Sequence, residues 1–233
     1  MRDSRDRLIV ALDVSSAAAA RKIVAAVGDS ASAYKVGMQL YTAEGPEIVR
    51  DLVSSGRRVF LDLKYHDIPN TVGAAVAEAS ALSVSMLTVH ASGGGTMLRA
   101  AVQAAAAASK PPLVLAVTVL TSLDDGELSK LGIRGNTVDQ VLRLAALAIS
   151  HGCGGVVASA REAAALREEL GPDFAIVTPG VRPAGSGHGD QARVVTPAEA
   201  IAAGATYVVV GRPITDAADP AEEARAILCQ IAS

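Results

Sequence analysis

Short apolar runs alternate with longer amphipathic or alanine-rich stretches along the whole chain. The short runs predict strands, because they are rich in β-branched and other apolar residues and are bounded by polar or glycine-containing breaks. They cover residues 8–12, 33–36, 59–63, 86–89, 113–117, 155–157, 175–177 and 207–210. Several are apolar at every position, which is typical of strands covered by helices on both faces. The stretches between them predict helices, among them residues 17–27, 46–55, 71–82, 138–150 and 160–170.

The repetition of strand and helix predicts a parallel α/β fold. Eight units share 233 residues, or about 29 residues each, which is the size of a βαβ repeat. Eight such units that close on themselves form a (β/α)8 TIM barrel. An open, doubly wound sheet is the alternative, but no Gly-x-Gly-x-x-Gly pattern follows the first strand, where a dinucleotide-binding fold has one. No linker, low-complexity tract or block of charge interrupts the chain, so we expect a single domain over residues 1–233.

Composition narrows the class of function. Half of the residues are hydrophobic, the formal net charge is −3, and the aromatic residues are four tyrosines and two phenylalanines. Such a chain lacks the basic surface and the stacking side chains of nucleic-acid-binding proteins. No apolar run approaches the roughly 18 residues of a membrane span, and the N-terminal sequence has no apolar stretch like that of a signal peptide. We therefore expect a cytoplasmic protein that binds neither nucleic acid nor membrane.

The two cysteines, Cys153 and Cys229, and the four histidines have no metal-site spacing. Cysteines outside such motifs are usually small buried hydrophobes, and we expect this of both. His90, at the end of a predicted strand, is expected to be a buried histidine without a catalytic role.

In a TIM barrel the catalytic groups gather at the C-terminal ends of the strands. Polar residues stand at most of the predicted strand ends: Asp13, Lys35, Asp62 with Lys64, His90, Thr121 with Ser122, Arg182 and Arg212. The Thr-Ser pair is also compatible with a helix cap or a turn. These ends are where we expect the functional site.

The most informative segment is F-L-D-L-K-Y-H-D-I-P-N-T at residues 60–71. Strand alternation puts Asp62 and Lys64 on one face, pointing into the mouth of the barrel. Lys35 is expected to point into the same mouth, with Asp67 just beyond. An ion pair that only stabilises the barrel end is the simpler explanation of one such pair. Two lysines and two aspartates, however, can form an alternating charged chain that keeps each lysine as an ammonium ready to donate a proton.

The loops after the seventh and eighth strands of barrels commonly bind phosphate. In this sequence they contain glycines, which let backbone N–H groups approach an anion, and arginines, which suit a phosphate dianion: Gly180, Arg182, Gly211 and Arg212. Gln191 can donate from its amide. The surrounding residues 183–192 include three glycines in five residues and predict a mobile lid, with a surface loop as the alternative.

The segment D-L-K-Y-H-D-I-P-N-T at residues 62–71 closely resembles the signature of the orotidine 5′-monophosphate decarboxylase family. Further segments that resemble the family follow in order: A-L-D at 11–13, K-V-G at 35–37, V-H-A-S-G-G at 89–94, V-T-V-L-T-S at 117–122, T-P-G-V-R-P at 178–183, G-D-Q at 189–191 and V-G-R-P at 210–213. Each segment is weak alone, but together, in order and at strand ends, they are highly specific. The bacterial form is the one that the sequence resembles.

The resemblance implies decarboxylation of orotidine 5′-monophosphate (OMP) to uridine 5′-monophosphate (UMP) and CO2. This is the last step of de novo pyrimidine biosynthesis, and it uses no cofactor and no metal. Lys64 would protonate C6 of the pyrimidine, Asp62 would lie near the departing carboxylate, and Lys35 and Asp67 would complete the charged chain.

The remaining roles concern binding and assembly. In the family, Asp67 reaches the active site of the partner subunit with Ile68 and Thr71 nearby, which implies a homodimer with shared sites. Asp13 would bind ribose hydroxyls, since Ser15 or Ser16 can cap the following helix. The resemblance makes Thr121 a substrate contact, and Ser122 can hydrogen-bond the pyrimidine edge.

Two rival functions compete with this one. Related barrel enzymes acting on sugar phosphates, either magnesium-dependent decarboxylases or aldol-type synthases, share D-x-K-x-x-D but place a carboxylate ligand where this chain has Lys35. A non-catalytic nucleotide-binding protein would have no use for the intact set of lysines and aspartates.

Overall fold

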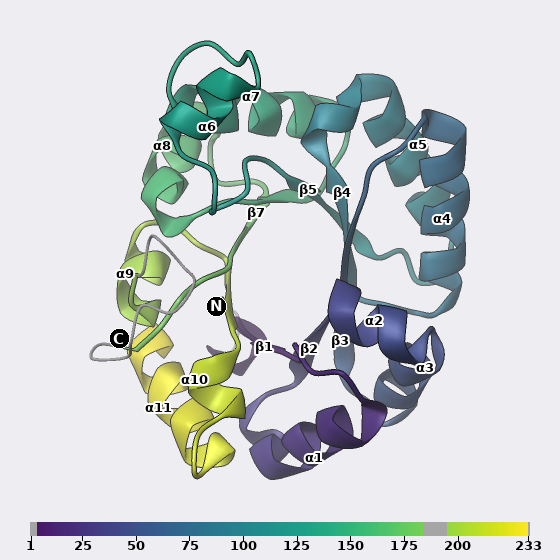
Figure 1. The fold of residues 1–233 in the computed structure, drawn as a ribbon, viewed down its shortest axis with the longest axis vertical. Coiled ribbons are helices and arrows are strands. Elements are labelled where there is room, and N and C mark those ends of the chain that lie inside the picture. Colours follow the sequence, from purple (N-terminus) through teal and green to yellow (C-terminus); the bar gives the residue numbers. More distant parts are fainter. Residues whose placement is uncertain (1–3, 184–194, 233) are drawn as a thin grey trace.

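The computed structural model describes residues 4–183 and 195–232. Eight parallel strands close into a barrel, with helices outside it (Figure 1). The strands are β1 (Leu8–Ala11), β2 (Ala33–Gly37), β3 (Arg58–Tyr65), β4 (Met86–His90), β5 (Leu113–Val117), β6 (Gly155–Val157), β7 (Ala175–Thr178) and β8 (Tyr207–Val210). Pairing of β1 with β8, for example Ile9 with Val209, closes the ring. The predicted TIM barrel is confirmed, and the open sheet is excluded.

One or two helices follow each strand along the chain. They are α1 (Ala17–Val27), α2 (Met38–Glu44), α3 (Glu47–Ser54), α4 (Pro69–Ala81), α5 (Gly94–Ala106), α6 (Asp125–Lys130), α7 (Thr137–Ser150), α8 (Ala160–Leu170), α9 (Pro197–Ala202), α10 (Arg212–Thr215) and α11 (Pro220–Ala232). Each of the five helices named from the sequence is present, with ends within one or two residues of the prediction. The Ser16 hydroxyl caps α1 by accepting from the Ala19 N–H, which leaves the Asp13 carboxylate free of that task.

The core has two layers, because successive strand residues point to opposite faces. Ile9 and Phe60 belong to a cluster inside the barrel, whereas their neighbours Val10 and Leu61 pack between strands and helices. The apolar cluster inside the barrel gives way to charged residues at the C-terminal ends of the strands.

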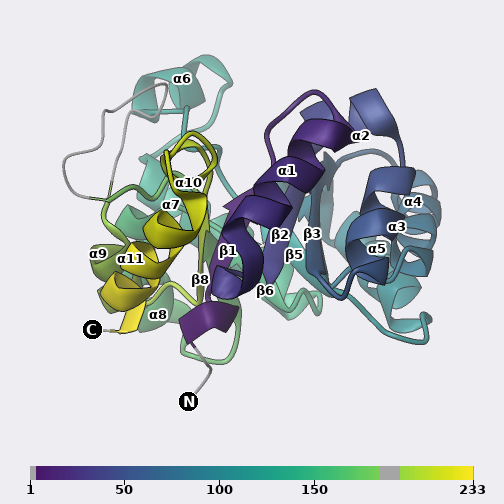
Figure 2. The same cartoon turned by 90° about the horizontal axis from the view of Figure 1, so that it is seen from below.

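Figure 2 shows α2 and α6 at one end of the molecule and both chain termini toward the other. These two helices follow β2 and β5 directly, so this end collects the C-terminal ends of the strands. The site described below lies here. In the described ranges, no helix is long and apolar enough to cross a membrane.

The cysteines differ from the prediction in part. Cys153 is buried as expected, and burial raises the pKa of its thiol to about 12. Cys229 is exposed, so the prediction for it was wrong. The buried face of α11 contains Ala224, Ile227, Leu228 and Ile231. Cys229 follows Leu228 by one residue, which turns its side chain about 100° around the helix and toward solvent.

Candidate active site

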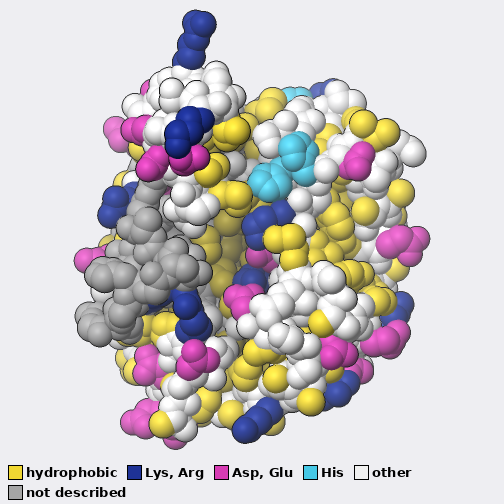
Figure 3. All heavy atoms as spheres, viewed as in Figure 1, with side chains coloured by type: hydrophobic (Ala, Val, Ile, Leu, Met, Phe, Trp, Pro, Cys, Tyr) yellow, Lys and Arg dark blue, Asp and Glu magenta, His cyan; other side chains and the backbone are white. Residues whose placement is uncertain are grey.

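A cavity of about 560 Å³ opens at the C-terminal end of the barrel. Its apolar lining comes from residues on the inner face of the barrel, among them Ala11, Phe60, Val117, Val157, Val177 and Val209. Its charged lining comes from the strand ends and the segments that follow them: Asp13, Lys35, Asp62, Lys64, Arg182, Arg212 and Asp216. Figure 3 looks onto this end and shows basic and acidic side chains gathered around a central hollow. The volume and the mixed lining suit one small polar molecule.

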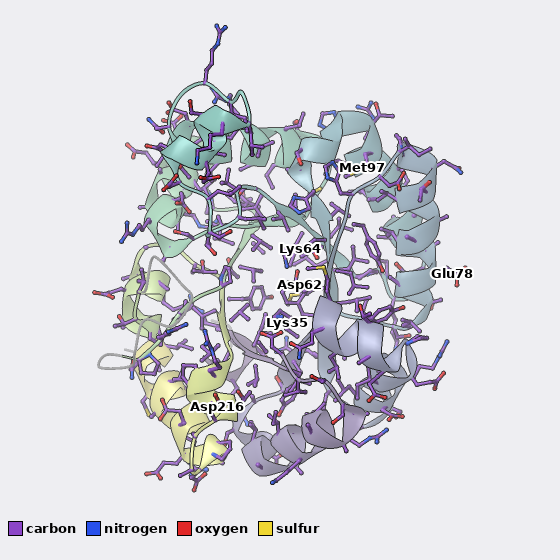
Figure 4. All side chains as sticks on the ribbon, in the orientation of Figure 1. Lys35, Asp62, Lys64, Glu78, Met97 and Asp216 are labelled. Atoms are coloured by element: carbon purple, nitrogen blue, oxygen red, sulfur yellow. The ribbon has the colours of Figure 1, made fainter. Side chains whose placement is uncertain are left out.

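Four charged side chains follow one another with alternating sign. The Lys35 Nζ lies 2.8 Å from the Asp13 Oδ1 and 3.7 Å from the Asp62 Oδ2. The Lys64 Nζ donates to both carboxylate oxygens of Asp62, at 2.9 Å each. Figure 4 shows Lys35, Asp62 and Lys64 one after another near the centre of the barrel.

Within one subunit the fourth charge is that of Asp13. Asp67, which the resemblance places in the partner's site, does not line the cavity of its own subunit. The Asp67 carboxylate instead accepts from the Ile68 N–H at 2.6 Å, at the exposed start of α4. Within one subunit the order is therefore Asp13, Lys35, Asp62 and Lys64.

Strand β3 is irregular where it contributes its two charged residues. Leu61 pairs with Leu87 of β4, but the next pair is Tyr65 with Val89. Asp62, Leu63 and Lys64 therefore stand opposite the single residue Thr88. Lys64 has a left-handed backbone, with φ of 53°, which costs a non-glycine residue about 1–2 kcal/mol. The side chains of Asp62 and Lys64 do meet, as predicted, but through this irregularity and not by plain alternation.

Thr88 is a site residue that the sequence reasoning missed. Its side chain is fully buried, and its hydroxyl accepts from the Lys64 N–H at 2.9 Å and contacts the Asp62 Oδ1 at 3.0 Å. The available signal was a lone hydroxyl in the apolar run M-L-T-V, directly before His90.

The predicted phosphate-binding residues line another part of the same cavity. Gly180, Arg182, Gly211 and Arg212 are all in the lining. Arg182 is buried and Arg212 is exposed. Gln191 and all of the predicted lid except Pro183 lie outside the described residues.

The other predicted contacts divide into two groups. Thr121 lines the cavity, whereas Ser122 does not; both lie in a turn after β5. Ile68 and Thr71 also lie outside the lining, and Ile68 is 66% exposed. The cavity of one subunit thus takes in Thr121 but not Ser122, Ile68 or Thr71.

His90 lies at the edge of the charged chain. Its ring centroid is 5.4 Å from that of His66. Burial is the main cause that lowers the pKa of His90, and the charges of His66 and Lys64 act in the same direction against the carboxylate of Asp62. Among the described residues, no three His, Cys, Asp or Glu side chains are grouped to hold a metal ion.

The sequence of this chain is similar to those of known proteins along nearly its whole length. Residues 6–227 match the family described as orotidine 5′-phosphate decarboxylase / HUMPS. The chain is 53% identical to the orotidine 5′-phosphate decarboxylase of Moorella thermoacetica, over 98% of this chain and 93% of that protein. It is also 53% identical to the enzyme of the same name from Anaeromyxobacter dehalogenans, over 95% of this chain and 96% of that protein.

Solved structures give the same result. The crystal structure of orotidine 5′-phosphate decarboxylase from Lactobacillus acidophilus has a TM-score of 0.88 and 38% identity, covering 98% of this chain and 100% of that one. The enzyme of the same name from Pyrococcus horikoshii has a TM-score of 0.77 and 26% identity, covering 97% of this chain and 99% of that one. The chain therefore belongs to the orotidine 5′-phosphate decarboxylase / HUMPS family.

Proposed function

We propose that this protein decarboxylates OMP to UMP and CO2, the last step of de novo pyrimidine biosynthesis, without cofactor or metal. The observation that carries the proposal is the chain of Asp13, Lys35, Asp62 and Lys64 in a cavity that also contains Arg182 and Arg212. Two relatives that are each 53% identical to this chain are named for the same activity.

The chemical problem is the electron pair left on C6 of the pyrimidine. When the C6–carboxylate bond breaks, CO2 leaves and the pair stays on C6, with no adjacent group to delocalise it. A fixed positive charge stabilises that pair as it develops. The Lys64 ammonium is such a charge, because the Asp62 carboxylate fixes it at 2.9 Å. Lys64 then transfers one proton to C6, which gives UMP and a neutral amine.

The other charges hold the donor and the substrate. Lys35, between Asp13 and Asp62, balances two carboxylates in a confined space. Asp62 would lie near the departing carboxylate. The Asp13 side chain is 58% exposed, so its second oxygen remains accessible to ribose hydroxyls.

The arginines would bind the 5′-phosphate. A guanidinium forks onto a phosphate through two parallel N–H groups, and glycine lets the backbone come close. Arg182, Arg212, Gly180 and Gly211 bring both features to one cavity. Gln191 would add an amide donor, and Thr121 and Ser122 would contact the pyrimidine. Phosphate binding energy, remote from C6, would then support the reaction there.

The working unit would be a homodimer in the cytoplasm. Asp67, Ile68 and Thr71 lie outside their own subunit's cavity, at the start of α4. An isoleucine that is 66% exposed there suits burial against a second copy. We therefore infer that Asp67 completes the charged chain of the partner's site.

The test is decarboxylation of OMP by the purified protein with a chelator present. Undiminished UMP formation supports the proposal. Activity that is lost on chelation and restored by magnesium would favour the sugar-phosphate relatives, although Lys35 stands where those need a carboxylate.

A further inference from the structure

Thr88 occupies a special position opposite β3. In the ladder between β3 and β4, Leu61 faces Leu87 and Tyr65 faces Val89. Three residues of β3 thus span the space of one residue of β4, which is Thr88. Asp62 and Lys64, the two residues proposed to act at C6, are the first and last of those three.

The hydrogen bonds of the Thr88 hydroxyl have a fixed direction. A backbone N–H can only donate, so the hydroxyl accepts from the Lys64 N–H at 2.9 Å. An ionised carboxylate can only accept, so the hydroxyl donates its own proton to the Asp62 Oδ1 at 3.0 Å. The hydroxyl therefore links the backbone of Lys64 to the carboxylate that holds the Lys64 ammonium.

We propose that Thr88 is a positioning residue for the decarboxylation, acting through Lys64 and Asp62. At the irregularity of β3, the Lys64 N–H donates to the Thr88 hydroxyl in place of a backbone carbonyl of β4. This hydrogen bond holds Lys64 in its left-handed conformation. It also fixes the rotation of the Asp62 carboxylate, leaving both oxygens directed at the Lys64 Nζ. This inference rests on the proposed roles of those two residues.

Packing alone does not account for a threonine here. The side chain is fully buried, next along the same strand face to Met86 and His90. A valine has nearly the same shape and would fill the space without burying a hydroxyl. The two hydrogen bonds are what distinguish threonine from valine at this position.

The experiment compares Thr88→Val, Thr88→Ala and Thr88→Ser in the full-length protein. Loss of a hydrogen bond to a charged group predicts a kcat about 10- to 100-fold lower in the first two variants, with KM within about threefold. Thr88→Ser keeps the hydroxyl and should stay within about threefold of wild-type kcat. Thr137→Val is the matched control, since Thr137 is also buried and its hydroxyl donates to a carboxylate, that of Asp125, while neither residue lines the cavity. Its kcat should match that of wild type.

Hydrogen exchange adds a measurement that does not depend on the variants folding. The Lys64 amide of the wild-type protein should exchange slowly, since Thr88 accepts its hydrogen bond. Three results would overturn the inference: wild-type kcat in folded Thr88→Val or Thr88→Ala, an equal loss of kcat in Thr88→Ser or Thr137→Val, or fast exchange of the Lys64 amide. Activity that survives Lys64→Ala would instead refute the proposed function itself, so the two failures are distinguishable.

Discussion

The Lys64 Nζ lies 2.9 Å from both carboxylate oxygens of Asp62. Two residues apart in sequence, they meet because β3 carries extra residues opposite Thr88 and because Lys64 has a left-handed backbone. The contact fixes an ammonium at the boundary between the apolar interior of the barrel and the charged end of the cavity. The ammonium is thereby held in place as a proton donor.

Lys64→Ala should abolish turnover while leaving product binding almost intact. The proposed proton donor and the main positive charge at C6 are lost together, so kcat should fall by at least about 1,000-fold. The phosphate would still bind to Arg182 and Arg212. Isothermal titration with UMP should therefore give a Kd close to that of wild type, whereas a Kd that rises in step with the loss of kcat would contradict the division of roles.

Mixing two inactive homodimers tests whether Asp67 works in the partner's site. If it does, a heterodimer of Lys64→Ala and Asp67→Ala subunits contains one unmutated site. Random subunit exchange makes half of the dimers heterodimers, so activity should return to about a quarter of the wild-type value. No recovery, with exchange demonstrated by mass spectrometry, would assign Asp67 to its own subunit's site.

Gly37→Ala should weaken catalysis without unfolding the protein. A Cβ at Gly37 would lie 2.9 Å from the Lys35 Nζ and 3.3 Å from the Asp13 Oδ1. The flexible end of Lys35 can move aside, so the thermal midpoint should change little. The displaced ammonium loses charged contacts, and kcat/KM should fall about 10- to 100-fold. Gly73→Ala is the control, because its Cβ would meet Ala100 at an ordinary 3.7 Å. An unchanged kcat/KM in Gly37→Ala would show that the position of Lys35 does not matter.

Stability should fall as the pH drops below the ordinary histidine value of 6.5. The pKa of His90 is lowered in the folded protein, mainly by burial. Below pH 6.5 the unfolded chain therefore binds a proton at this position that the folded chain does not, and unfolding becomes easier. The effect of one such group is at most about 1.4 kcal/mol per pH unit and ends at the folded-state pKa. Urea midpoints at pH 7.5 and 5.5 should differ less in His90→Gln than in wild type. An equal difference in both proteins would contradict the assignment to His90.

One thiol of the two should react in the native protein. Cys229 is exposed, whereas Cys153 is buried with its pKa raised to about 12, which leaves almost no thiolate at neutral pH. Titration with an aromatic disulfide should therefore give one equivalent in buffer and two in denaturant, and none in native Cys229→Ser. Two equivalents in buffer would contradict the burial of Cys153.

The strands, the five named helices and the barrel could be predicted because each depends on local periodicity and on the number of repeats. Residues at strand ends, such as Lys35 and Arg212, were found for the same reason: in a closed parallel barrel, every strand end faces one cavity. What could not be predicted depends on pairing between strands. The irregular register of β3 exists only relative to β4, so neither the left-handed Lys64 nor the role of Thr88 is visible in one strand alone.

The contact between Asp13 and Lys35 shows the same limit in another way. Asp13 follows β1 and Lys35 lies in β2, so their ion pair becomes visible only once the two strands are paired. The structure pairs Asp13 with Lys35 and leaves Asp67 outside the cavity. Cys229 was misassigned because its position on α11 depends on which helix face meets the barrel.

The most direct test of the central claim is the rate of UMP formation from OMP by the purified wild-type protein, measured with and without excess EDTA and beside Lys64→Ala. The account predicts equal rates for wild type in both buffers and no measurable turnover for the variant. Turnover that disappears with EDTA and returns with magnesium, or that persists in Lys64→Ala, would contradict it.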